Sequence, residues 1–175
     1  MKKIVAFGAS SSKTSINKQF AIYTANQFEN AIVELLDLNN FELPVFSIDK
    51  EKETGIPQLA HDFYTKIGSA DLVIISFAEH NGNYSAAYKN IFDWTSRINA
   101  KVYQQKPVLL LATSPGARGG SSVLDIAKNS FPFQGAQVKG SFSLTSFYDI
   151  FDTEKGITNE GLKMQLFEII NAIEF

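Results

Sequence analysis

Serine, threonine and asparagine side chains gather just after the first apolar run of the chain. This first loop runs from Gly8 to Ser15 and leads into a segment with a helical apolar pattern. Free N–H groups at the start of a helix, together with the helix dipole, favour an anion such as a phosphate ester. The alternative is a plain polar turn, because serine and threonine start many helices without binding a ligand. The candidate donors to a phosphate are Ser10, Ser12, Ser15 and Asn17.

The glycine content of this loop limits the kind of phosphate that it suits. A P-loop needs a second glycine directly before its lysine, but Lys13 follows Ser12. A dinucleotide fingerprint needs three glycines after the first strand, but Gly8 stands alone. We therefore expect a single phosphate monoester rather than a pyrophosphate or a triphosphate.

Amides and a glycine make up the second loop, residues 78–85. Gly82 has backbone freedom that other residues lack, so a flat ligand can approach the main chain there. The side chains of Asn81 and Asn83 can hydrogen-bond to the edge of a heteroaromatic ring. The alternative is an Asn-Gly turn before a helix that Asn83 or Ser85 caps.

Three glycines within five residues mark the third loop, Ser114–Ser121. Gly116, Gly119 and Gly120 leave the backbone exposed, so that a flat ring can stack against it. Loops of this composition also occur in turns that bind nothing. Because this loop directly follows an apolar run typical of a buried strand, we favour a binding role for it.

Metal chemistry and acid–base chemistry find little support in the sequence. The two histidines, His61 and His80, lie on different segments, and His80 has no evident carboxylate partner. A histidine of this kind more often packs or contacts a ring than catalyses. The chain has no cysteine, which excludes disulfides, thiolate zinc sites, iron–sulfur clusters and cysteine nucleophiles. We predict no metal site.

The composition is typical of one globular domain spanning residues 1–175. Hydrophobic residues make up 45% of the chain and charged residues 19%. The formal net charge of −2 gives no basic field that would attract nucleic acid or anionic lipid. The first apolar run has about four residues before Gly8, whereas a membrane span needs about 20. We therefore expect no nucleic-acid partner, no membrane and a cytoplasmic location.

Strand and helix patterns alternate along the chain. The third and fourth apolar runs are hydrophobic at consecutive positions, as in strands covered on both faces of a parallel sheet. This order predicts an open α/β doubly wound sheet, in which ligands bind beyond the carboxyl ends of the strands, where the three loops lie. The expected strands are Ile4–Phe7, Ile32–Leu38, Leu72–Phe77, Val108–Ala112 and Gln137–Leu144, and the expected helical faces lie within residues 20–28, 60–67, 84–92 and 162–173.

The longest stretch without a clear pattern is Asn39–Pro57. It contains the charge run Asp49–Glu53, which we expect to be a solvated excursion beyond the edge of the sheet.

With these loops in place, the chain resembles the NADPH-dependent FMN reductase family, which is flavodoxin-like and includes azo, quinone and chromate reductases. The phosphate loop of that family reads Gly-Ser-x-Arg-x-x-Ser-x-Asn, and residues 10–17 match its serine and asparagine spacing. Ser12 stands at the arginine position, with Lys13 beside it.

Three further motifs carry the same resemblance. Residues 78–81 are similar to the family's Pro-Glu-Tyr-Asn, from which Ala78 and His80 depart, and residues 89–94 match Lys-Asn-x-x-Asp-Trp. Residues 114–120 match Ser-x-Gly-x-x-Gly-Gly, and residues 38–44 also look like the family.

The resemblance implies a flavodoxin-like, doubly wound five-stranded parallel sheet in the order 2-1-3-4-5. It also implies bound FMN, NADPH or NADH as reductant, and a flavin, quinone, azo or similar small-molecule acceptor. Flavin N5 carries the hydride, so no catalytic side chain is expected. By position, the resemblance assigns the FMN phosphate to Ser10, Ser12, Ser15, Ile16 and Asn17, the ring and ribityl side to Glu79, His80, Asn81 and Gly82, and the other rim to Ser114, Gly116 and Gly119.

Two other functions stay open at this point. One is a flavin-binding electron carrier that does not turn over a nicotinamide. Typical flavodoxins, however, have a threonine-rich phosphate loop with a central glycine and are markedly acidic, and this chain has neither feature. The other is a non-catalytic relative that binds no cofactor and acts through partners.

Assembly is also open. Aromatic residues on the predicted helix Tyr84–Ile98, including Trp94, either pack on the sheet or form an interface. Members of the resembled family are often dimers or tetramers, so a homodimer or homotetramer is the expectation that the resemblance adds.

Overall fold

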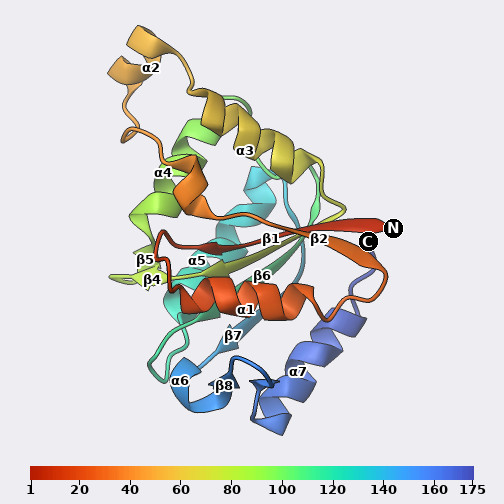
Figure 1. The fold of residues 1–175 in the computed structure, drawn as a ribbon. Coiled ribbons are helices and arrows are strands. Elements are labelled where there is room, and N and C mark those ends of the chain that lie inside the picture. The colour runs from red at the N-terminus through yellow and green to blue at the C-terminus, as the bar shows by residue number, and fades with distance from the viewer.

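The computed structural model describes all 175 residues and is built around one parallel sheet (Figure 1). Its strand order is β2-β1-β3-β6-β7, which is 2-1-3-4-5 when the five strands of the sheet are numbered along the chain. The predicted doubly wound sheet is therefore confirmed. Its strands are β1 (Lys2–Ala9), β2 (Ala31–Leu35), β3 (Leu72–Phe77), β6 (Pro107–Thr113) and β7 (Gln137–Leu144).

Helices cover both faces of the sheet, because the central strands are apolar on both sides. In β1, Ile4 and Ala6 face one core, whereas Val5 and Phe7 face the other. The first core is covered by α1 and α7, and the second by α3, α4 and α5. The helices are α1 (Ile16–Ala25), α2 (Ile48–Thr54), α3 (Gln58–Gly68), α4 (Ala86–Ser96), α5 (Ser121–Ser130), α6 (Phe147–Ile150) and α7 (Glu160–Asn171).

Short elements complete the connections between the layers. Two antiparallel hairpins, β4–β5 and β8–β9, lie outside the main sheet. The bounds of the short elements are β4 (Glu79–His80), β5 (Asn83–Tyr84), β8 (Phe151–Asp152), β9 (Gly156–Ile157) and the 3-10 turns η1 (Leu38–Phe41) and η2 (Phe131–Gln134).

The segment after β2 departs from the sequence prediction. The second strand ends at Leu35 rather than Leu38, because the Asp37 carboxylate accepts a hydrogen bond from the Asn39 N–H and starts η1. The stretch predicted to be irregular contains a helix, α2, that Ser47 caps and Gly55 ends. None of its residues is buried, and it projects at one corner of the molecule (Figure 1), where Glu51 pairs with Arg97 at the end of α4 at 2.9 Å. The charge run is therefore solvated as expected, but helical.

Two further boundaries differ from the prediction. Tyr84 lies in β5, and α4 begins only at Ala86, because the Ser85 hydroxyl accepts from the Tyr88 N–H as its cap. The helix α5 carried no clear pattern in the sequence. Its buried stripe consists only of Val123, Leu124 and Ala127, which is too short to stand out.

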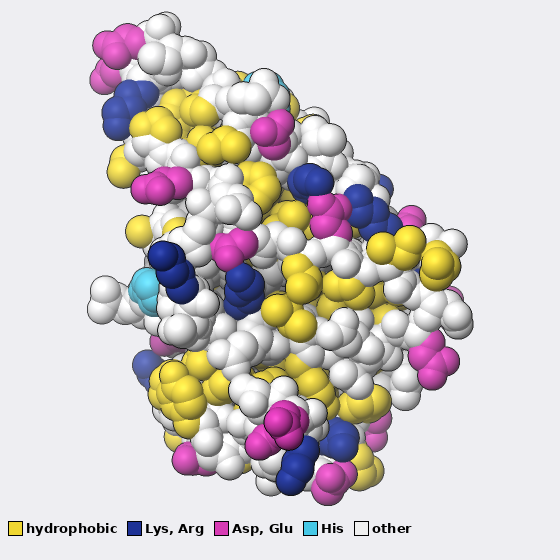
Figure 2. Space-filling model, in the orientation of Figure 1, with side chains coloured by type: hydrophobic (Ala, Val, Ile, Leu, Met, Phe, Trp, Pro, Cys, Tyr) yellow, Lys and Arg dark blue, Asp and Glu magenta, His cyan; other side chains and the backbone are white.

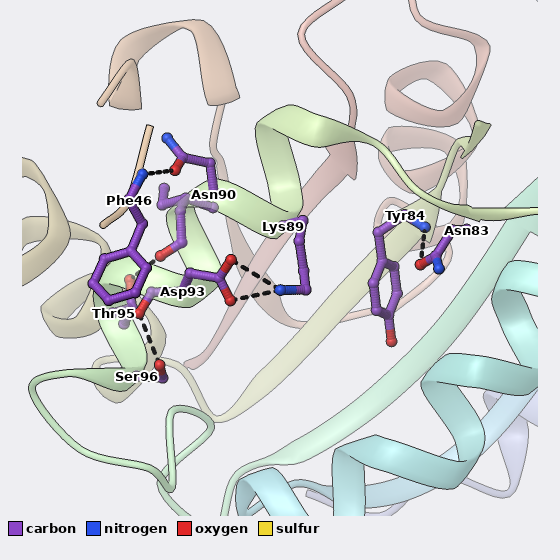
Figure 3. Close-up of polar contacts among 9 residues, drawn as sticks. Phe46, Asn83, Tyr84, Lys89, Asn90, Asp93, Thr95 and Ser96 are labelled. Atoms are coloured by element: carbon purple, nitrogen blue, oxygen red, sulfur yellow. Dashed lines mark hydrogen bonds and ion pairs between the residues drawn. The ribbon is translucent and has the colours of Figure 1, made fainter. Parts of the chain in front are cut away.

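The helix α4 holds the chain that follows η1. The Asn90 side-chain oxygen accepts from the Phe46 N–H at 2.8 Å (Figure 3). Its amide nitrogen donates to the Leu43 carbonyl at 3.0 Å. The Trp94 indole N–H donates to the Pro44 carbonyl at 2.7 Å, and its ring meets that of Phe46 edge-on. Trp94 is fully buried within the chain. Trp94 therefore packs inside the chain, but against the segment after η1 and in neither core of the sheet, and an interface between copies of the chain stays a prediction.

We predict that Asn90→Ala lowers the free energy of unfolding by about 1–3 kcal/mol, because the Phe46 N–H and the Leu43 carbonyl lose this partner, whereas the Pro44 carbonyl keeps its bond from the Trp94 indole. The neighbouring Lys89→Ala is the matched control. It removes only an exposed ion pair with Asp93, so we expect a loss of about 0.5 kcal/mol or less. Urea denaturation of both variants measures the difference, and equal losses would contradict the anchoring role of Asn90.

Candidate functional site

The three polar loops meet at the carboxyl edge of the sheet, around a cavity of about 240 Å³. The first loop and the start of α1 supply six of its thirteen lining residues, and the second loop supplies three. The end of β6 and the third loop supply three more, and Tyr148 comes from the segment after β7. The lining residues are Ser10, Ser12, Thr14, Ser15, Ile16, Asn17, Ala78, Glu79, His80, Thr113, Ser114, Pro115 and Tyr148.

Close packing of α1 against β1 shapes the first loop. A Cβ atom on Gly8 would lie 2.4 Å from the Lys18 nitrogen, so only glycine lets the first turn of α1 approach the end of β1 this closely. The Ser15 hydroxyl caps α1 by accepting from the Lys18 N–H. The N–H groups of Ile16 and Asn17, in the first turn, have no acceptor within the chain.

Free hydroxyl groups lie beside these two N–H groups. Ser12 and Thr14 are exposed, and their side chains make no hydrogen bond within the chain. Ser10 accepts from the Ser12 N–H, which leaves its own hydroxyl hydrogen free to donate. The loop therefore presents several hydrogen-bond donors to one small space, as a phosphate monoester requires.

The Asn17 side chain points into the protein instead. Its oxygen accepts from the Ser76 hydroxyl at 2.7 Å and from the Thr113 N–H at 3.1 Å, and its amide donates to the Thr113 carbonyl at 3.1 Å. All three residues are buried. The Asn17 side chain thus fixes the start of α1 to the ends of β3 and β6, and only its backbone N–H faces outward as a free donor.

The second loop is a β-hairpin with a two-residue turn. Asn81 and Gly82 have φ angles of 52° and 75°, as a type I′ Asn-Gly turn requires. His80 pairs with Asn83 across the hairpin and also lines the cavity. The turn reading of this segment is therefore confirmed, and the hairpin projects beyond the end of the sheet (Figure 1).

Glu79 links the second loop to the third. One oxygen of its carboxylate accepts from the Val123 N–H at 3.2 Å, at the start of α5, and the other lies 3.5 Å from the Arg118 guanidinium. A carboxylate is favoured at a helix start because it satisfies a free N–H and the helix dipole. Glu79 therefore closes the wall between the two loops.

Two glycines of the third loop have different surroundings. Gly119 has a φ of 59°, and a Cβ atom there would lie 2.4 Å from the Ser143 hydroxyl oxygen. Gly116 is exposed, and a Cβ atom there would have only the Ser114 hydroxyl near it, at 4.0 Å. The fold thus requires a glycine at position 119, whereas position 116 has room for a larger side chain.

The cavity gathers most, but not all, of the residues that the sequence singled out. It is lined by all five residues assigned to the phosphate and by Glu79, His80 and Ser114, whereas Asn81, Gly82, Gly116 and Gly119 lie outside its wall. Five lining residues were not predicted. Thr14, Ala78, Thr113 and Pro115 adjoin predicted residues, so the loops themselves signalled them, but Tyr148 comes from a fourth connection, after β7.

No lysine or arginine lines the cavity. Lys18, in α1, pairs with Asp37 at 2.6 Å, and this contact, with help from the Asn39 N–H, lowers the pKa of Asp37 to about 2. Lys13 is exposed in the first loop, and the ion pairs of the structure all involve other cations. The face in Figure 2 mixes cationic and acidic side chains without a large patch of one sign.

None of the helices combines the length and the apolar character that crossing a bilayer would take. The described residues also contain no cluster of histidine, aspartate and glutamate side chains that could hold a metal ion.

Known proteins resemble this chain in both sequence and fold. The chain is 31% identical to an NADPH azoreductase of Bacillus sp. strain OY1-2 over 70% of its own length and 65% of that protein. It is also 31% identical to a quinone reductase of Escherichia coli K12, over 57% of the chain and half of the relative's length. A structure of the flavoenzyme FerB of Paracoccus denitrificans, named as an NAD(P)H:(acceptor) oxidoreductase, shares 21% identity and a TM-score of 0.77, covering 98% of this chain and 94% of FerB.

The sequence profile that describes NADPH-dependent FMN reductases matches residues 2–149, which include every loop around the cavity. The match extends over most of the chain, and the strand order agrees with the flavodoxin-like fold of the structural relatives. The chain therefore belongs to the NADPH-dependent FMN reductase family of oxidoreductases.

Proposed function

We propose that this protein binds FMN at the carboxyl edge of its sheet and passes reducing equivalents from NADPH or NADH to a small-molecule acceptor. The proposal rests on the cavity at the carboxyl edge. There, hydrogen-bond donors of the first loop and the start of α1 that have no acceptor in the chain face the second and third loops, whose main chain is accessible. Flavin, quinone and azo compounds are the acceptor classes we propose. Family membership and the names of the relatives support this set.

The first loop fits the phosphate end of FMN. Two backbone N–H groups, of Ile16 and Asn17, and the hydroxyls of Ser10, Ser12 and Ser15 converge on one cavity. The positive end of the α1 dipole points at the same place. Because no cation lines the cavity, these dipoles supply most of the stabilisation that we propose for the phosphate charge.

The second and third loops fit the remainder of the cofactor. The Asn81–Gly82 turn and the exposed Gly116 offer main-chain groups with little bulk above them. His80, Glu79 and Ser114 line the side of the cavity from which a ribityl chain and a ring would extend. We therefore keep the predicted roles of these residues, with Glu79 acting through the shape of the wall and Gly119 through the conformation of the third loop.

The chemistry needs little from the side chains. When bound, FMN would supply the hydride-transfer chemistry at its N5 atom. The chain's own task is to hold the phosphate, to orient the ring between the hairpin and the third loop, and to keep one ring face open. We assign no catalytic side chain to this site, and His80 keeps only its predicted place beside the ring.

We also propose that residues 1–175 act as one FMN-binding domain in the cytoplasm. A homodimer or homotetramer stays a prediction, and sedimentation at micromolar concentration tests it.

The first test compares FMN with riboflavin, which lacks the phosphate. We expect FMN to bind the purified protein at least about tenfold more tightly, because the first loop acts only on the phosphate (about 1.4 kcal/mol for tenfold). Isothermal titration calorimetry measures both affinities.

A second experiment adds NADPH or NADH to the FMN-loaded protein without oxygen. The bound flavin bleaches if the protein is a reductase, whereas flavin that stays oxidised with both would identify an electron carrier.

The missing arginine of the first loop gives a second prediction. Ser12→Arg places a cation beside the proposed phosphate, and we expect the FMN affinity to rise about tenfold while riboflavin affinity stays the same. Lys13→Ala removes the exposed cation of this loop and should weaken FMN binding severalfold, again without an effect on riboflavin. Equal effects on the two ligands would mean that the phosphate lies elsewhere.

The two glycines of the third loop give a matched pair of variants. We expect Gly119→Ala to lower the free energy of unfolding by about 1–2 kcal/mol or more, since its φ is 59° and Ser143 blocks the added methyl group. Gly116→Ala should change stability by less than about 0.5 kcal/mol but should weaken FMN binding, because only the ligand would meet the methyl group. Thermal unfolding and FMN titration separate the two effects. Unchanged FMN affinity in Gly116→Ala would place the ring away from this residue.

A further inference from the structure

An exposed aromatic side chain stands at the mouth of the cavity. Tyr148 is 72% exposed, yet it lines the same cavity as the hydroxyl groups of the first loop. It lies in α6, after β7, and so comes from a part of the chain outside the three polar loops. Exposed aromatic rings beside a concave polar site commonly mark where a flat ligand stacks.

The backbone around Tyr148 is fixed. Ser146 has a φ of 46°, and its N–H donates to the Gly116 carbonyl at 3.0 Å. The Phe147 N–H donates to the Ser114 carbonyl at 3.1 Å. These two bonds fasten the turn before α6 to the third loop, and Figure 1 shows the loop after β6 running down to α6. Tyr148 is thus positioned by the same loop that we assign to the flavin rim.

The neighbouring residue anchors the turn from inside. Phe147 is 3% exposed, and its ring stacks on that of Phe151 with 4.5 Å between the ring centres. The Tyr148 ring meets the Phe147 ring edge-on at 5.7 Å. The turn therefore places one aromatic ring in the core and holds the next one out over the cavity. Because the Tyr148 ring is mostly exposed, packing of the core does not require an aromatic residue at this position.

We propose that Tyr148 stacks on the flat ring of the flavin bound in this cavity, and so acts as a positioning residue for the cofactor. The inference rests on the proposed function. It adds a contact from a fourth loop, so that the ring would lie between the hairpin that carries His80 and the aromatic face of Tyr148.

The test uses Tyr148→Ala and Tyr148→Phe in the full chain, with Phe133→Ala as the control. Phe133 is 78% exposed but does not line the cavity, so its exposure is similar to that of Tyr148 while its location is outside the site. The measurements are the FMN dissociation constant, the fluorescence of bound FMN, the KM of the acceptor and the melting temperature. Excited flavin takes an electron from a phenol ring in contact with it and returns it, so a stacked tyrosine quenches the emission.

We expect Tyr148→Ala to weaken FMN binding about tenfold, as is typical for the loss of one ring stack, and to make bound FMN more fluorescent. Tyr148→Phe should keep most of the affinity and lose most of the quenching. Phe133→Ala should change neither, and all three variants should melt near the wild-type temperature, since both positions are exposed.

Other results would overturn the inference. If Tyr148→Ala changes neither the FMN affinity nor the fluorescence of bound FMN, the flavin ring does not contact Tyr148. An effect only on the KM of the acceptor means that Tyr148 contacts the second substrate and not the flavin. Wild-type protein that binds no FMN overturns the proposed function together with this inference, whereas wild-type binding with unchanged variants overturns the inference alone.

Discussion

Hydrogen bonds between buried side chains and strand ends hold the carboxyl edge of this sheet together. Asn17 joins the start of α1 to Ser76 at the end of β3 and to Thr113 at the end of β6. The Thr113 hydroxyl then donates to the Leu144 carbonyl of β7 at 2.7 Å, and the Ser85 hydroxyl donates to the Ala9 carbonyl of β1 at 2.7 Å. Since an unpartnered buried polar group costs about 1–3 kcal/mol, these bonds define one arrangement of the loops.

This internal bonding separates two kinds of polar group at the site. Some side chains form hydrogen bonds within the protein and so set the shape of the cavity, namely those of Asn17, Ser85 and Glu79. The hydroxyls of Ser12 and Thr14 and two N–H groups of α1 are left free. A site with fixed walls and free donors is preorganised for its ligand, because little order has to be gained on binding.

A division between framework and free groups also holds for the family-like pattern on α4, Lys-Asn-x-x-Asp-Trp. Asn90 and Trp94 bind the segment after η1 and contribute no atom to the cavity. Their role is to hold Leu43–Phe46 against the helix, beside the loop edge of the sheet. Membership in the FMN reductase family thus rests partly on residues that build the frame of the site rather than on residues that line it.

The sequence by itself determined the sheet, the strand order expected from the resemblance, and the three loops. Consecutive apolar positions in β3 and β6 require cover on both faces, and parallel strands bring the ends that follow them to one edge. Only the tertiary structure decided that Asn17 and Glu79 face inward and that Tyr148 joins the cavity. Each of these outcomes depends on contacts between residues distant in the chain, such as Asn17 with Thr113 and Ser146 with Gly116, and local residue patterns carry no signal for such pairings. The short helices α2 and α5 escaped prediction for a related reason, since a capping serine and a three-residue stripe are weak signals until the neighbouring elements are in place.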